Sequence, residues 1–276
     1  MKLTLVRHLW GVDHTLGLDH YLPRWRDAGY TAVEGSIRLS AHREAMLGFL
    51  KTSGMGFVAQ VLGRELTPGG SVREHLDSLK EQIEEALEHD PLFVNAHSGS
   101  DSWSHNEAVD FYGAMLEMEQ SLGIPICHET HRMRYFANPW ATRSILELYP
   151  DLKLTCDFSH WVCVAERLLQ DCDEIIRLAA EHCFHLHARV GHEEGPQVSD
   201  PRAPEWSAHL AAHERWWDII WQSQKRRGVE TSYLTPEFGP PPYQATLPHT
   251  GVPVADLADI CDWMARRETS RFMERL

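Results

Sequence analysis

Eight short apolar runs alternate along the chain with longer segments in which apolar residues recur every three to four positions. The short runs have the length and the β-branched content of buried strands, whereas the longer segments have the spacing of amphipathic helices. We expect strands at residues 2–8, 31–34, 56–60, 92–97, 124–129, 152–157, 184–187 and 232–237. We expect helices at residues 19–28, 40–53, 71–89, 105–121, 139–148, 164–182, 207–226 and 254–270.

Strict strand–helix alternation predicts a parallel sheet that is covered by helices. The 276 residues, shared by eight such units, leave about 34 residues for each. A (β/α)₈ TIM barrel typically needs ~250 residues, so we predict a single TIM-barrel domain over residues 1–276. Two long connections, 188–206 and 238–252, follow predicted strands and are expected to cover a substrate, because barrel enzymes build their active sites at the carboxyl ends of the strands.

Composition narrows the class of protein further. The 26 basic and 40 acidic side chains give a formal charge of −14, which disfavours binding to nucleic acid. The sequence has no apolar stretch typical of a membrane span or a signal peptide, so we expect a cytoplasmic protein without a membrane partner. The six cysteines form no CxxC pair and are expected to be reduced and buried.

Polar side chains end all eight predicted strands, and in a parallel barrel these ends meet at one mouth. They are His8, Glu34, Gln60, His97, Glu129, Asp157, His187 and Glu237. Carboxylates crowded together repel one another and raise their own pKa values unless a cation neutralises them. Glu129, Asp157, His187 and Glu237 form a mixed oxygen and nitrogen set that suits one divalent ion, Mn²⁺, Mg²⁺, Co²⁺ or Zn²⁺. The other four either line the pocket or satisfy backbone groups.

Four short motifs, in this order, carry a family resemblance. They are HETHR at 128–132, CDFSH at 156–160, HLH at 185–187 and PEFG at 236–239. Together they resemble the xylose isomerase-like TIM-barrel superfamily, which includes sugar isomerases, ketose 3-epimerases, hydroxypyruvate isomerase, inosose dehydratase and endonuclease IV. The resemblance implies that Glu129, Asp157, His187 and Glu237 bind the metal and that His160 contacts the substrate. The segment NAHSGS at 95–100 resembles a motif that contributes another pocket histidine, here His97.

The resemblance also suggests a reaction. Its isomerases and epimerases exchange protons with a sugar carbon through an enediolate, and Glu129 and Glu237 would be the acid/base pair. A dehydratase of an inosose-like polyol ketone and a non-catalytic sugar-binding barrel remain alternatives. Endonuclease IV implies a further histidine on the third strand and an Asp-x-His after the seventh. Gln60 and the sequence ARVGH at 188–192 lack these ligands, which argues against endonuclease activity.

Several other side chains are candidates to contact a sugar or polyol substrate. Arg132, Arg189 and His192 could hold anionic or hydroxyl groups, although surface ion pairs would explain the arginines equally well. His8, Trp10 and Trp161 could wall the pocket, or the tryptophans could simply pack. His128 or His131 could orient Glu129. Trp216, Trp217 and Trp221 have helical spacing that favours burial in the core or in the interface of a homo-oligomer.

Overall fold

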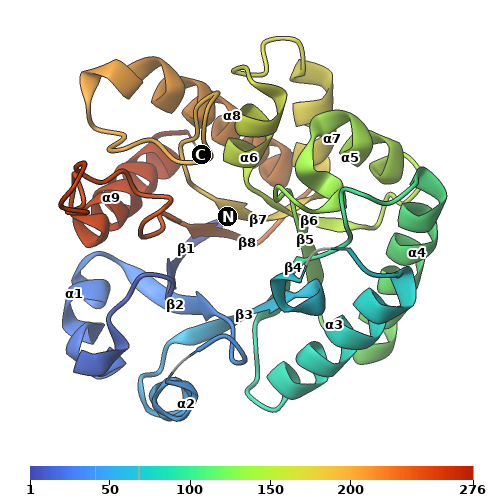
Figure 1. Cartoon of the computed structure of the whole chain (residues 1–276), viewed down its shortest axis with the longest axis horizontal. Helices are drawn as coiled ribbons and strands as arrows, with labels where there is room; N and C mark the ends of the chain where they lie inside the picture. Colours follow the sequence, from blue (N-terminus) through green and yellow to red (C-terminus); the bar gives the residue numbers. More distant parts are fainter. Residues whose placement is uncertain (41, 68, 276) are drawn as a thin grey trace.

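Eight parallel strands close into one barrel in the computed structural model, which describes residues 1–40, 42–67 and 69–275 (Figure 1). Each strand pairs with the next along the chain, and the eighth pairs with the first, so the predicted (β/α)₈ fold is confirmed. The strands are β1 (Lys2–His8), β2 (Tyr30–Gly35), β3 (Gly56–Leu62), β4 (Phe93–His97), β5 (Ile126–Glu129), β6 (Lys153–Cys156), β7 (Cys183–His187) and β8 (Thr231–Thr235).

Helices form a ring around the strands (Figure 1). They are α1 (Leu22–Asp27), α2 (Arg43–Thr52), α3 (Val72–Leu87), α4 (His105–Leu122), α5 (Pro139–Leu146), α6 (Phe158–Ala165), α7 (Asp173–His182), α8 (Ser207–Arg226) and α9 (Leu257–Arg275). Short 3₁₀ turns are η1 (His14–Leu16), η2 (Leu18–His20), η3 (Gly63–Leu66), η4 (Tyr135–Ala137) and η5 (Pro204–Trp206). Over the described ranges, no helix combines the length and apolar character that a bilayer crossing requires.

Local sequence signals fix several helix boundaries. Ser71 and Ser104 begin α3 and α4 with capping boxes, in which each serine side chain accepts a backbone N–H while a glutamate three residues later reaches back. Gly123 ends α4 in the left-handed conformation, with φ of 68°. These signals are consistent with predicted helices at 71–89 and 105–121 that differ from the observed ones by at most two residues at either end.

The helix expected over 164–182 is the largest error of the sequence-based assignment. α6 begins at Phe158, because the Asp157 side chain accepts the backbone N–H of Ser159 and caps that helix. Glu166 and Leu169 both have a φ of 52°, which interrupts the backbone, and a separate helix α7 begins only at Asp173. The strand ends also shift, since β6 stops one residue before Asp157 and β8 stops two residues before Glu237.

The barrel interior is apolar toward the amino ends of the strands and polar at their carboxyl ends. Val6, Ala32, Val58, Phe93 and Cys127 form an apolar cluster inside the barrel. The Phe93 ring lies 5.0 Å from that of His185, which belongs to the polar layer above. A larger core lies between strands and helices and contains the three tryptophans of α8, so these residues pack within the chain. All six cysteines are free.

Candidate metal centre and substrate cavity

The four predicted metal ligands converge at the carboxyl ends of neighbouring strands. Glu129 and His187 are the last residues of β5 and β7, while Asp157 and Glu237 lie just beyond β6 and β8. One ligand atom from each of the four lies within 4.8 Å of every other, and all four residues are buried. The barrel thus gathers side chains from positions 129 to 237 at a single point.

Three atoms of this group are buried without a hydrogen bond to any described residue. They are Glu129 Oε1, Glu237 Oε2 and His187 Nδ1. His187 Nδ1 lies 2.9 Å from Glu237 Oε2 and 3.7 Å from Glu129 Oε1, so the three face a common point. Buried polar atoms normally have partners, and two carboxylate oxygens with one imidazole nitrogen are a donor set for a divalent cation. The residues therefore fit the metal that the resemblance implies.

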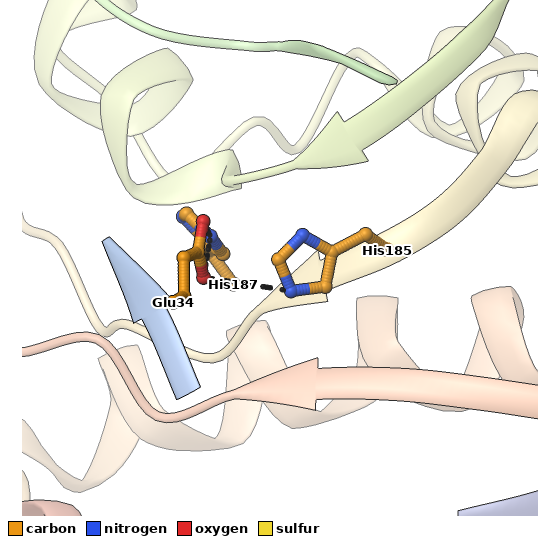
Figure 2. Close-up of side chains that lie close together, drawn as sticks. All are labelled: Glu34, His185 and His187. Carbon is orange, nitrogen blue, oxygen red and sulfur yellow. Dashed lines mark hydrogen bonds and ion pairs between the residues drawn. The ribbon is translucent and has the colours of Figure 1, made fainter. Parts of the chain in front are cut away.

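Glu34, on β2, holds the opposite edge of the His187 ring (Figure 2). Each Glu34 carboxylate oxygen lies 3.1 Å from His187 Nε2. Glu34 also accepts hydrogen bonds from Asn95 Nδ2 at 2.8 Å and Thr235 Oγ1 at 2.9 Å. Burial alone would raise the pKa of Glu34, but His187 and His185 lower it to about 2. An ionised Glu34 keeps the proton of His187 on Nε2 and leaves Nδ1 available to a cation.

The pKa of His187 reflects the same surroundings. Burial favours the neutral ring, yet the carboxylates of Glu34, Glu237 and Glu129 together raise the pKa well above its usual value. The surrounding carboxylates therefore favour the protonated form of the His187 ring.

His185 completes the cluster in Figure 2, on β7 two residues before His187. Its Nε2 lies 2.7 Å from Thr235 Oγ1 and 3.8 Å from Glu34 Oε2. Burial lowers the pKa of His185 to about 3, so its ring is neutral. Because Asn95, Thr235 and His187 already occupy the Glu34 oxygens, this cluster orients His187 and offers less room for a cation of its own.

The second carboxylate oxygen of Glu129 contacts neighbouring side chains of the barrel. Its Oε2 accepts hydrogen bonds from Asn95 Nδ2 at 2.8 Å and lies 2.7 Å from His97 Nε2. Burial would raise the pKa of Glu129, but His97 and His187 lower it below its usual range. Glu129 is therefore an ionised group whose Oε1 remains free.

Arg189 binds the carboxylates on the other side of the centre. Its Nη2 pairs with Asp157 Oδ2 and lies 3.3 Å from Glu237 Oε2. The same nitrogen lies 2.6 Å from His160 Nε2, and Nε donates to Ser159 Oγ at 3.1 Å. Burial raises the pKa of Asp157 to about 6, although Arg189 opposes that rise. Arg189 thus stabilises the carboxylate cluster.

A cavity of about 620 Å³ opens above the centre. Of the predicted ligands, only Glu237 is among the described residues that line it. Five predicted substrate contacts also line it, namely His8, Trp10, His97, Arg132 and Arg189. His8 Nε2 lies 3.4 Å from Glu237 Oε1 and 3.1 Å from Gln60 Nε2, and Gln60 Nε2 lies 3.3 Å from His97 Nε2. The remaining wall includes the apolar residues Leu9, Val12, Leu39, Met46, Leu62 and Met133.

Three predicted substrate contacts are not brought into the cavity lining. His160 is fully buried against Arg189. Trp161 donates from its indole to the Phe136 carbonyl at 2.9 Å and packs in the core. Both follow from the early start of α6, which turns these side chains away from the mouth. His192 forms an antiparallel bridge with Gly195, and its ring contacts Trp206 at 5.0 Å.

Tyr243 and His131 line the cavity, although sequence reasoning did not assign them to it. The Tyr243 ring contacts Trp10 edge-on at 4.8 Å. The only sequence signal for Tyr243 was its place in the long connection 238–252. His131 lies between His97 at 4.4 Å and His160 at 4.0 Å, measured between ring centroids. His128 instead bonds to Ser98 Oγ at 2.7 Å.

The two long connections meet beside the cavity. Gly239 donates its backbone N–H to Gln197 Oε1 at 2.7 Å, and its carbonyl accepts from Gln197 Nε2 at 3.0 Å. A Cβ on Gly239 would lie 2.1 Å from the Trp10 ring, so only glycine permits this close approach. The expected position of both connections at the strand ends is therefore observed.

Neither a protein-family model nor a curated protein matches the sequence. Solved structures with a similar fold include a D-tagatose 3-epimerase-like protein (15% identity, 99% of this chain and 97% of that chain, TM-score 0.62). A probable 3-DHS dehydratase from Bacillus anthracis shares 14% identity over 97% of this chain and 99% of that chain, with a TM-score of 0.60. A xylose isomerase-like TIM barrel protein from Mycobacterium smegmatis, in complex with magnesium, shares 12% identity over 99% of this chain and 97% of that chain, with a TM-score of 0.65. These likenesses show the xylose isomerase-like barrel fold.

Proposed function

We propose that the chain is a divalent-metal-dependent isomerase or epimerase of a sugar or a sugar-like hydroxy-carbonyl compound. The observation that carries this proposal is the convergence of Glu129, Asp157, His187 and Glu237 directly below a cavity, with Glu129 Oε1, His187 Nδ1 and Glu237 Oε2 facing a common point. The presence of sugar epimerases and a dehydratase among proteins of the same fold supports it.

The four residues would hold one ion, Mn²⁺, Mg²⁺, Co²⁺ or Zn²⁺, through Glu129 Oε1, His187 Nδ1, Glu237 Oε2 and the Asp157 carboxylate. Such an ion, when bound, polarises a substrate carbonyl and stabilises the negative charge that develops on its oxygen. Arg189 keeps Asp157 and Glu237 in place, while Glu34 keeps the His187 ring in its orientation. The protein thus supplies a preorganised and buried site.

Glu237 is the better placed of the two acid/base carboxylates, because it lines the cavity. Burial would raise its pKa, but Arg189, His187 and His8 hold that pKa well below its usual value, so Glu237 is ionised and can accept a proton from a substrate carbon. Glu129 does not line the cavity itself and is connected to it by His97, which does. Proton return from the Glu129 side would give epimerisation, whereas Glu237 alone could move a proton between neighbouring carbons.

Deuterium exchange tests this proposal. Mn²⁺-loaded protein is incubated in D₂O with a panel of ketoses, inososes and hydroxypyruvate, and NMR detects deuterium at the carbon beside the carbonyl. We expect exchange with at least one compound, and Glu237→Gln should slow it by about 100-fold or more. Glu193→Gln is the matched control, because Glu193 pairs with His209 away from the cavity lining.

The products identify the reaction class. Exchange with an isomer or epimer as product supports the proposal, and loss of water with exchange at the same carbon identifies a dehydratase. Saturable binding without exchange across the panel would indicate a non-catalytic sugar-binding barrel. If Glu237→Gln still binds the metal and exchanges deuterium at the full rate, Glu237 is not the acid/base group.

A further inference from the structure

Two arginine side chains lie against the same aromatic ring in the cavity wall. The guanidinium carbon of Arg132 lies 4.7 Å from the centroid of the Tyr243 ring, and that of Arg189 lies 5.3 Å from it. Arg132 follows β5 by three residues and Arg189 follows β7 by two, so both side chains come from segments that continue directly from proposed metal ligands. They are the only arginine or lysine residues among the described lining of the cavity.

The two guanidinium groups differ in their partners. Arg189 is 1% exposed and pairs with both Asp157 and Glu237, so its charge is neutralised by the protein. Arg132 is partly exposed to the cavity, and no carboxylate oxygen of the described residues lies within 4 Å of its nitrogens. Its guanidinium lies over the Tyr243 ring and opposes the rise that burial causes in the pKa of the Cys163 thiol. In a chain with 40 acidic residues, the cavity therefore contains one cation that the protein does not pair.

We infer that Arg132 binds a carboxylate group of the substrate. The planar guanidinium fork matches a carboxylate through two parallel hydrogen bonds, and contact with the Tyr243 ring restricts the Arg132 side chain before binding. The inference rests on the proposed function, because it assumes that the reacting end of the same molecule lies at Glu237. It names the substrate class as a hydroxy-carbonyl acid, in preference to a neutral sugar.

The charge balance favours a carboxylate over a phosphate. A phosphate carries a larger negative charge and is usually held by several donors, such as a helix N-terminus together with basic side chains. Here one unpaired guanidinium matches a single negative charge. The second guanidinium at the Tyr243 ring, that of Arg189, is already neutralised by Asp157 and Glu237.

Two matched pairs of compounds test the inference, because the members of each pair differ only in CH₂OH against COO⁻. The pairs are D-fructose with D-fructuronate and dihydroxyacetone with hydroxypyruvate, and D-fructose 6-phosphate serves as the phosphate probe. Dissociation constants are measured by calorimetry on the Mn²⁺-loaded full chain, on Arg132→Gln and on Arg132→Lys. Arg73→Gln removes the same charge from the outer face of α3, where Arg73 is 89% exposed, and is the control.

In the unaltered protein and in Arg73→Gln, we expect the carboxylate member of at least one pair to bind about 10-fold to 100-fold more tightly than its neutral partner. Arg132→Gln should abolish that preference, and Arg132→Lys should retain only part of it because lysine lacks the fork. Equal melting temperatures would show that the variants are folded.

Two results would overturn the inference. One is the lack of an Arg132-dependent carboxylate preference: either no pair of compounds shows a preference, or Arg132→Gln retains it. A preference retained in Arg132→Gln would indicate that the carboxylate binds the metal directly. The other is a larger Arg132-dependent preference for D-fructose 6-phosphate than for D-fructuronate. Exchange measurements separate this inference from the proposed function. Arg132-dependent binding without deuterium exchange would support the carboxylate site and contradict the proposed isomerase or epimerase activity. Exchange without any carboxylate preference would support that activity and contradict the carboxylate site.

Discussion

At the scale of single residues, the orientation of His187 depends on a carboxylate three strands away from it in the closed barrel. Glu34 on β2 accepts the Nε2 proton of His187 on β7, and Asn95 and Thr235 hold Glu34 from two further strands. Metal-binding histidines commonly donate their other ring N–H to a carboxylate, which fixes the tautomer and makes the ligand more basic. Glu34 is therefore a positioning residue for the proposed metal centre.

Replacing Glu34 by glutamine should weaken metal binding by about 10-fold to 100-fold. The amide can still accept the Nε2 proton, but it lacks the negative charge that strengthens His187 as a ligand. Titration of metal-free protein with Mn²⁺, followed by calorimetry or by electron paramagnetic resonance of the free ion, measures the change without any assay of activity.

Glu44→Gln is a suitable control for that titration, since Glu44 lies exposed in the first turn of α2. Equal Mn²⁺ affinity in Glu34→Gln and in the unaltered protein would show that Glu34 has no influence on the centre. Measured melting temperatures of the metal-free proteins would separate a loss of folding from a loss of affinity.

At the scale of elements, α8 and α9 enclose a charged cluster against the core. Glu214 on α8 receives Arg267 and Arg271 from α9, and Arg271 also pairs with Asp218 at 2.8 Å. Glu268 on α9 is fully buried beside them, and its Oε1 lacks a hydrogen-bond partner in the described structure. Burial and the nearby Glu214 raise the pKa of Glu268 to about 8, although Arg271 opposes that rise.

This buried acid predicts a pH-dependent loss of stability. Below pH 4.5, the ordinary pKa of a glutamate, Glu268 is protonated in both the folded and the unfolded chain. The stability that the neutral side chain contributes to the folded protein is then fully present. Between that pH and about 8, the unfolded chain ionises while the folded chain does not, so the free energy of unfolding falls. Glu268→Gln stays neutral and should gain on the order of 4 kcal/mol relative to the parent between pH 5 and pH 8.5.

Denaturant unfolding of the parent and of Glu268→Gln at pH 5, 7 and 8.5 measures this gain. Glu117→Gln, on the exposed face of α4, should show a difference from the parent that does not change with pH. A constant difference for Glu268→Gln as well would mean that Glu268 is ionised in the folded protein throughout this range.

The helices also differ in how well the sequence predicts their boundaries. Apolar periodicity located α3, α4 and α8 to within two residues, because local interactions determine these helices. The start of α6 depends on Asp157, which the strand pattern assigned to a strand end. A cap and a ligand use the same short polar residue types, so periodicity alone does not distinguish them. His160 and Trp161 were therefore assigned to the cavity although α6 buries them.

At the scale of the whole molecule, barrel closure accounts for what could be foreseen of the site. Once eight strands are known to be parallel and closed, their carboxyl ends and the residues just beyond must share one mouth, which brings Glu129, His187 and Glu237 together without knowledge of any side-chain conformation. Partners that arise from side-chain conformation were not foreseen. Nothing in the sequence indicated that Arg189 would be neutralised by Asp157 while Arg132 would have no carboxylate beside it.

Barrel closure also implies that an ion bound at the proposed centre would contribute to the stability of the fold. The proposed ligands come from the ends of β5 to β8, so one ion would join four consecutive units of the barrel and offset the repulsion among three buried carboxylates. An ion that binds only the folded state, at 100 times its dissociation constant, adds about 2.7 kcal/mol. We therefore expect Mn²⁺ to raise the melting temperature of chelator-treated protein by roughly 4–10 °C. Glu237→Gln should show a much smaller rise and Glu193→Gln the full one, whereas equal melting temperatures with Mn²⁺ and with chelator would remove the ion from this site.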